Sequence, residues 1–139
     1  MPDEIIIVDT GPLIAFLVEQ DQHHDWAVEQ FKSLPAPFFT CEAVLAETFH
    51  IVQRWTNGSR RALDLLDSDA LLVGIDIMEQ RKPIRQLMLK YRNVPMSLAD
   101  ACLVRLSEIH RGSSVFTLDS DFAIYRRNGR EQINVISPR

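Results

Sequence analysis

The sequence has few cysteines and no long apolar runs, and these absences exclude several classes of protein. Only two of its 139 residues are cysteine, Cys41 and Cys102, and they belong to no disulfide or zinc-binding pattern. Apolar runs such as Ile5–Val8 are far shorter than the roughly 20 residues of a membrane span. The acidic start, residues 1–4, lacks the features of a secretory signal. We therefore expect no membrane association, a cytoplasmic location, and two buried cysteines that pack as small hydrophobic residues.

Lysine occurs only three times, and charge is distributed unevenly along the chain. Residues 1–53 contain nine Asp and Glu against one Lys, whereas residues 54–139 contain fourteen Lys and Arg against ten acids. A net charge of −4 disfavours non-specific binding of nucleic acid, because affinity for phosphate comes largely from Lys and Arg. Nucleic acid is a plausible partner only if a cation bridges the acidic part to phosphate and the basic part holds the backbone.

No linker, repeat or low-complexity tract interrupts the chain, so we expect one domain over residues 1–139. Short β-branched or aromatic runs predict strands, and apolar residues three and four apart predict helices. The predicted strands are residues 5–8, 38–39, 71–75, 113–118 and 133–136. The first predicted helix begins at about residue 12. The other predicted helices cover about 24–34, 41–55, 59–66, 78–91, 97–109 and 122–127. This alternation of strands and helices predicts an α/β fold with a parallel sheet and right-handed crossovers.

Two acidic residues directly follow predicted strands. Asp9 comes after Ile5–Val8, and Asp119 comes after Val115-Phe116-Thr117-Leu118. In an open parallel sheet the binding crevice lies outside the carboxyl ends of the strands, so both side chains are expected there. Taken singly, each is more simply explained as an ordinary turn or cap residue.

Two further acids belong to predicted helices. Glu47 lies near the boundary of the buried face of the helix over 41–55, and Asp100 is the last residue of the capping-box pattern Ser97-Leu98-Ala99-Asp100. A solvated helix acid and a cap are the simpler explanations. The combination of four acids from four segments instead indicates a shared site.

Several carboxylates cannot all ionise at close range without a cation, because like charges raise one another's pKa. Mg²⁺ and Mn²⁺ prefer oxygen ligands and retain water, and such ions can orient a water for attack on a phosphodiester. The acids therefore predict a divalent cation, and no histidine is needed as a base.

Four short motifs occur in order along the chain: Ile7-Val8-Asp9-Thr10, Leu45-Ala46-Glu47, Leu98-Ala99-Asp100-Ala101 and Phe116-Thr117-Leu118-Asp119-Ser120-Asp121-Phe122. Together they resemble the PIN domain, in particular the VapC-type toxin ribonucleases of toxin–antitoxin pairs. The resemblance covers almost the whole chain. It implies a three-layer α/β/α sandwich with a mostly parallel central sheet, and an endoribonuclease that depends on Mg²⁺ or Mn²⁺. It also implies a homodimer and inhibition by a cognate antitoxin protein.

The resemblance also assigns roles to individual residues. By position, the family's four acids, which bind metal and act in catalysis, correspond to Asp9, Glu47, Asp100 and Asp119. Asp121 matches another frequently acidic position, so either Asp119 or Asp121 is the closer metal ligand. Two hydroxyl positions beside the acids, which orient a carboxylate or water in the family, correspond to Thr10 and Thr117. Simple capping explains these two threonines equally well.

Contact with RNA is expected from the basic part of the chain. The group that follows the Asp119 turn comprises Arg126, Arg127 and Arg130, and a second group comprises Arg54, Arg60 and Arg61. A solvated charged face is the alternative explanation for both groups. If the first group binds RNA, replacing Arg126 and Arg127 is expected to weaken binding and flatten its salt dependence.

Two other functions are compatible with such a sheet. One is phosphoryl transfer with Asp9 as nucleophile or phosphoacceptor, but Gly11 stands where haloacid-dehalogenase-type phosphatases have a second Asp. The paired acids and late Lys of a receiver domain are also missing. The other is a PIN-like domain that binds RNA or protein without cutting, although four acids at one crevice would then only reduce stability.

Overall fold

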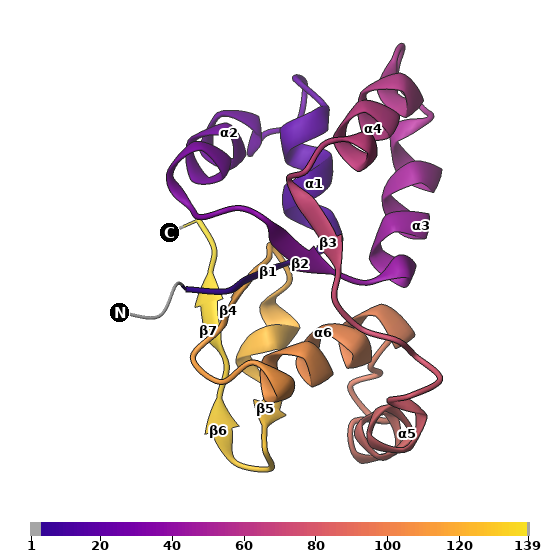
Figure 1. The fold of residues 1–139 in the computed structure, drawn as a ribbon, viewed down its shortest axis with the longest axis vertical. Helices are drawn as coiled ribbons and strands as arrows, with labels where there is room; N and C mark the ends of the chain where they lie inside the picture. Colours follow the sequence, from indigo (N-terminus) through magenta and orange to yellow (C-terminus); the bar gives the residue numbers. More distant parts are fainter. Residues whose placement is uncertain (1–3, 139) are drawn as a thin grey trace.

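The core of the fold is a sheet of five short parallel strands. The computed structural model describes residues 4–138. The strands are β1 (Ile6–Val8), β2 (Phe38–Thr40), β3 (Leu71–Val73), β4 (Ser114–Phe116) and β7 (Asn134–Ile136). Their order in the sheet is β3-β2-β1-β4-β7 (Figure 1). The central strands β1 and β4 are buried along their whole length, as expected for a parallel sheet that is covered on both faces.

Helices cover both faces of this sheet. They are α1 (Thr10–Leu17), α2 (His24–Ser33), α3 (Glu42–Val52), α4 (Gly58–Asp67), α5 (Arg81–Lys90) and α6 (Leu98–Ile109). The first four connect β1 to β2 and β2 to β3 and lie on one face, whereas α5 and α6 connect β3 to β4 and lie on the other (Figure 1). Right-handed crossovers produce this division. The predicted three-layer α/β/α sandwich with a parallel central sheet is confirmed.

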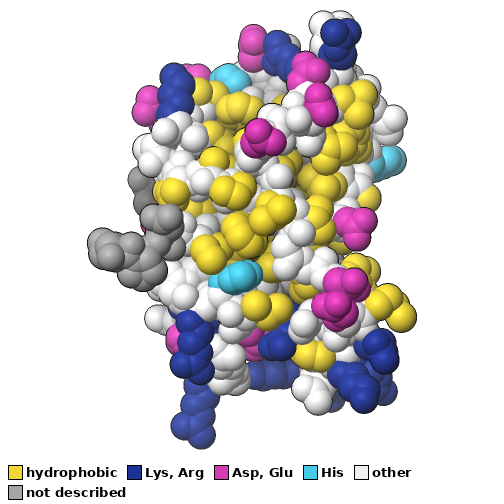
Figure 2. Space-filling model, in the orientation of Figure 1, with side chains coloured by type: hydrophobic (Ala, Val, Ile, Leu, Met, Phe, Trp, Pro, Cys, Tyr) yellow, Lys and Arg dark blue, Asp and Glu magenta, His cyan; other side chains and the backbone are white. Residues whose placement is uncertain are grey.

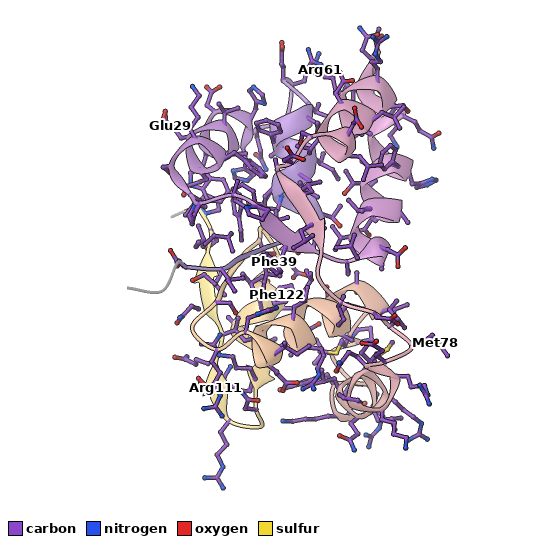
Figure 3. All side chains as sticks on the ribbon, in the orientation of Figure 1. Glu29, Phe39, Arg61, Met78, Arg111 and Phe122 are labelled. Atoms are coloured by element: carbon purple, nitrogen blue, oxygen red, sulfur yellow. The ribbon has the colours of Figure 1, made fainter. Side chains whose placement is uncertain are left out.

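Aromatic side chains fill the space between the sheet and α2. The ring of Phe31 lies 4.7 Å from that of Phe38 and 5.1 Å from that of Phe116, and Trp26 packs edge-on against Phe116. Phe122 is also buried, and Figure 3 shows it in the middle of the molecule, whereas Arg111 and Met78 lie toward the periphery. This dense packing fixes the strand ends that carry the acidic residues.

The segment after β4 differs from the prediction. A helix over 122–127 was expected, but the chain forms a single 3-10 turn, η1 (Ser120–Ala123), followed by a hairpin of β5 (Arg126–Arg127) and β6 (Glu131–Gln132). The reason is the Asn128-Gly129 pair, which adopts positive φ angles of 51° and 87°. Asn-Gly is a strong hairpin signal, and it ends the helical pattern here.

The structure also bears on the two cysteines and on the length of the apolar helices. Cys41 and Cys102 are both buried and both have free thiols, as predicted. Within residues 4–138, no helix has the length and apolar character needed to cross a membrane.

Candidate metal centre

The strand order creates a crevice between β1 and β4. The chain runs from β1 to β2 and β3 and then returns to β4 on the other side of β1, so the order reverses at this point. Ligands of open α/β sheets bind outside the carboxyl ends of the strands at such a switch point. Because Val8 and Phe116 are register partners, the residues that follow them, Asp9 and Thr117, emerge side by side in the crevice.

Asp9 is held in place through both of its carboxylate oxygens. The Thr117 hydroxyl donates to Oδ2 at 2.7 Å, and the Thr10 backbone N–H donates to Oδ1 at 2.7 Å, which caps α1. The side chain is buried, and desolvation raises the pKa of Asp9 to about 6, with the charges of Asp100 and Asp119 adding to the rise and the two hydrogen bonds opposing it. An ionised Asp9 is therefore unfavourable in this crevice unless a cation lies nearby.

Asp119 and Asp121 are positioned by the turn that follows β4. The backbone N–H of Asp119 donates to Thr117 Oγ1 at 2.9 Å, and that of Asp121 donates to Asp119 Oδ1 at 2.9 Å. Thr117 thus contacts both Asp9 and the Asp119 backbone. The turn brings a carboxylate oxygen of both residues near Asp100, and both side chains are half-buried.

Asp100 reaches the same place from the first turn of α6. The Ser97 hydroxyl accepts a hydrogen bond from the Asp100 N–H at 3.0 Å, which is one half of the predicted capping box. The Asp100 carboxylate is bound by Tyr125, whose hydroxyl donates to Oδ2 at 2.8 Å. Desolvation raises the pKa of Asp100, the Tyr125 hydrogen bond opposes this rise, and the charge of Asp119 adds to it.

Three of these acids form a tight carboxylate cluster. One carboxylate oxygen from each of Asp100, Asp119 and Asp121 lies within 4.8 Å of the others. Oxygen ligands of Mg²⁺ bind at about 2.1 Å, so oxygens on opposite sides of one ion are about 4.2 Å apart. The spacing of the cluster therefore fits a single hard cation after small side-chain adjustments.

A cavity of about 490 Å³ lies beside this cluster, and its lining includes Asp9, Glu47, Asp100 and Asp119. Glu47 lies on the exposed face of α3, outside the tight cluster but at the same cavity. Thr10 also lines it, and the buried Thr10 Oγ1 has no hydrogen-bond partner among the described residues. A buried hydroxyl without a partner costs free energy, so Thr10 supports a polar ligand or water in this cavity.

The arginines that follow the Asp119 turn have different surroundings from those expected. Arg127 is only 4% exposed, its Nη1 donates to the Ser113 carbonyl at 3.0 Å, and its guanidinium pairs with Glu131. The strand pairing of β5 turns this side chain inward, whereas the sequence analysis expected Arg127 on the surface that contacts RNA. Arg126 is half-buried and donates to three backbone carbonyls at the end of η1 and directly after it, whereas Arg130 is exposed.

Sequence reasoning missed Tyr125 as a member of the site. It is fully buried, and its ring packs edge-on against Tyr91 and Phe122. The sequence did show a tyrosine a few residues after the acidic turn. A buried tyrosine hydroxyl needs a hydrogen-bond partner, and a nearby acid can be that partner. No motif identified Asp100 as that partner, because the two residues are far apart in the chain.

Replacing Tyr125 with Phe is expected to weaken Mn²⁺ binding about tenfold, because groups that orient a metal ligand typically contribute 10- to 100-fold in affinity. The change removes the hydroxyl on Asp100 and keeps the ring contacts. Isothermal titration with Mn²⁺ measures the effect. Tyr91→Phe is the matched control, since the Tyr91 hydroxyl accepts from the Arg126 N–H and does not contact an acid. Equal affinity in wild type and Tyr125→Phe would contradict a positioning role.

Comparison with known proteins agrees with this architecture. The family model described as PIN domain matches residues 6–128. The crystal structure of Mycobacterium tuberculosis VapC20, described as a sarcin-ricin loop cleaving toxin, is similar with a TM-score of 0.74 and 21% sequence identity, covering 86% of this chain and 93% of that one. No curated protein matches the sequence. At this identity the structural likeness demonstrates the fold.

Proposed function

The chain belongs to the PIN domain family, and from this premise we propose that it is an endoribonuclease that uses Mg²⁺ or Mn²⁺ to hydrolyse phosphodiester bonds of RNA. The observation that carries the proposal is the convergence of Asp100, Asp119 and Asp121 beside the buried Asp9. A set of oxygen-only ligands favours hard divalent cations. RNA is proposed as the substrate class because the structurally similar VapC20 is described as cleaving the sarcin-ricin loop.

Each group of residues at the site has a distinct role in this proposal. The cluster of Asp100, Asp119 and Asp121 would hold the ion, and Asp9 and Glu47 add negative charge at the same cavity. When bound, the ion supplies an activated water and neutralises charge that develops on the scissile phosphate. Thr117 and Tyr125 keep the Asp9 and Asp100 carboxylates oriented through hydrogen bonds. The free Thr10 hydroxyl is placed to bond a water or a phosphate oxygen in the cavity.

We also propose the biological setting that this family suggests. The chain would act as a single domain over residues 1–139, as the toxin of a type II toxin–antitoxin pair in the cytoplasm, and a cognate antitoxin would inhibit it. A homodimer is proposed because apolar side chains are exposed on α4 and on the edge strand β3, at Leu63, Leu66, Leu72 and Val73. Hydrophobic side chains are also spread widely over the face in Figure 2.

Cleavage of total cellular RNA by the purified chain, freed of any co-purified partner, tests the proposal. We expect discrete fragments with Mn²⁺ or Mg²⁺ and none in EDTA, because the carboxylates need a cation to act on phosphate. The same preparation is expected to sediment as a dimer. Absence of cleavage in every metal, together with tight metal-independent binding to RNA or to a protein, would favour the non-cutting PIN-like module.

A further inference from the structure

Helix α5 has a charge distribution that disfavours its own stability. From residue 80 to residue 99 the chain has no Asp or Glu and five cations, which are Arg81, Lys82, Arg85, Lys90 and Arg92. All five side chains are exposed. These five residues are called the α5 basic surface below.

Three features of this surface are electrostatically unfavourable. Arg81 and Lys82 lie in the first turn of α5, where the positive end of the helix dipole repels cations, and no acid accompanies them there. Arg81 and Arg85 are four residues apart, a spacing at which like charges repel one another. Within residues 4–138, none of the five cations forms an ion pair; the pairs involve Arg61, Arg105 and Arg127 instead.

The contacts that the five cations do make leave their charge uncompensated. Arg81, Lys90 and Arg92 each donate one hydrogen bond to a backbone carbonyl, whereas Lys82 and Arg85 make no hydrogen bond among the described residues. Figure 2 shows Lys and Arg side chains gathered at the lower end of the molecule, where Figure 1 places α5 and the β5–β6 hairpin. Long side chains with nitrogen at their tips project outward there in Figure 3. Unfavourable charge placement of this kind, with no compensating ion pair in the described part of the fold, is expected where a surface has a function.

The α5 basic surface is linked to the carboxylate cluster by two aromatic residues. Tyr91 directly follows α5, and its ring packs edge-on against Tyr125 with 5.1 Å between the centroids. The Tyr125 hydroxyl in turn donates to Asp100 at 2.8 Å. The C-terminal end of α5 is therefore connected to the acids through two residues, and the helix itself is about 15 Å long.

We propose that the α5 basic surface binds the phosphate backbone of RNA on one side of the cleavage site. The inference rests on the proposed function for the choice of RNA. The charges are complementary to this partner, because an acidic site repels RNA and phosphate affinity requires Lys and Arg nearby. This surface takes over the role expected of Arg127, and the exposed Arg130 adjoins it, since Lys90 Nζ donates to the neighbouring Gly129 carbonyl at 3.2 Å.

The test compares two triple variants with the same change in net charge. The first is Lys82→Gln, Arg85→Gln and Arg92→Gln on the α5 basic surface. The comparison variant is Lys32→Gln, Arg54→Gln and Arg60→Gln, three exposed cations on α2, just after α3 and on α4. Arg54 and Arg60 belong to the second basic group at which RNA contact was expected, so this variant tests the rival surface. Binding of a fluorescein-labelled RNA stem-loop of about 30 nucleotides is measured by anisotropy in EDTA, so that no cleavage is needed.

The α5 variant is expected to bind the RNA about 100-fold more weakly at 0.1 M salt. The plot of log K against log salt should also become less steep by about 2, because three phosphate contacts are lost. The comparison variant is expected to stay within about threefold of wild type. A larger loss of RNA binding there than in the α5 variant would overturn the α5 assignment in favour of the surface of Arg54 and Arg60. The melting temperature of the α5 variant should stay the same or rise, because like-charge repulsion is removed. A fall in melting temperature would instead show that these three side chains stabilise the folded protein.

The outcomes separate this inference from the nuclease. If the chain cleaves RNA but both triple variants bind it equally, the α5 assignment is overturned and the nuclease stands. If the α5 variant alone loses RNA binding while wild type cleaves nothing with any metal, the α5 assignment stands and the nuclease falls. Poly-glutamate that displaces the RNA as well as unlabelled RNA does, at equal charge concentration, would overturn the assignment to RNA and indicate an acidic protein segment.

Discussion

Asp9→Asn is expected to abolish most RNA cleavage and, at the same time, to make the metal-free protein more stable. Activity should fall by about 10³-fold or more, because loss of one preorganised electrostatic group at a reacting phosphate has effects of this order. The free energy of unfolding at pH 7.5 should rise by about 1–3 kcal/mol, because the change removes a buried charge whose pKa is raised to about 6. Cleavage assays and urea denaturation in EDTA measure the two effects.

The opposite signs of these two effects make the prediction specific. Asn keeps an oxygen for the Thr10 N–H, so the cap of α1 survives the substitution. Asp69→Asn is the matched control, since Asp69 is exposed and lies outside the cavity, and it should change neither quantity. An Asp9→Asn protein that is less stable than wild type and still cleaves RNA would show that Asp9 is a structural cap.

The stability of the metal-free protein should decrease as the pH rises from about 4 to about 7. Folding raises the pKa of Asp9 from 3.8 to about 6, so the folded state binds more protons than the unfolded state in this interval. The resulting penalty is complete above about pH 7 and amounts to roughly 3 kcal/mol. Asp100 contributes in the same direction, because its pKa is also raised. Urea unfolding in EDTA at pH 4.5, 6 and 7.5 measures the trend.

Other titrating groups also affect stability, so the decisive quantity is the difference between wild type and Asp9→Asn at each pH. This difference should be small at pH 4.5 and largest at pH 7.5. Added Mn²⁺ should stabilise wild type at pH 7.5 far more than at pH 4.5, because metal binding requires ionised carboxylates. A difference that stays constant with pH would show that Asp9 is not desolvated in the folded protein.

Much of the architecture was predictable from the sequence, because the determining signals are local. The run Ile5–Val8 with no polar face identified a strand buried on both sides, and the Ser97 capping pattern identified the start of α6. The positions of Asp9 and Asp119 after strands then placed them at one edge of the sheet. The parallel register of β1 and β4 then places Asp9 beside Thr117.

The features that sequence reasoning missed depend on contacts between distant segments or on competing local signals. The Tyr125 hydrogen bond to Asp100 joins residues that the fold alone brings together. Arg127 was expected on the surface, but the Asn128-Gly129 hairpin directs its side chain toward Ser113. The basic character of α5 was visible in the sequence, but its link to the site requires the packing of Tyr91 on Tyr125.

The proposed function depends on the binding of a divalent cation by Asp100, Asp119 and Asp121 beside Asp9. Anomalous diffraction from crystals soaked in Mn²⁺ tests it most directly, because the signal locates the ion itself. We expect a peak about 2.0–2.4 Å from a carboxylate oxygen of each residue in the cluster, and its loss in Asp100→Asn crystals. A fully soaked crystal with no peak at this cluster, or with the only peak elsewhere, would contradict the proposed metal site.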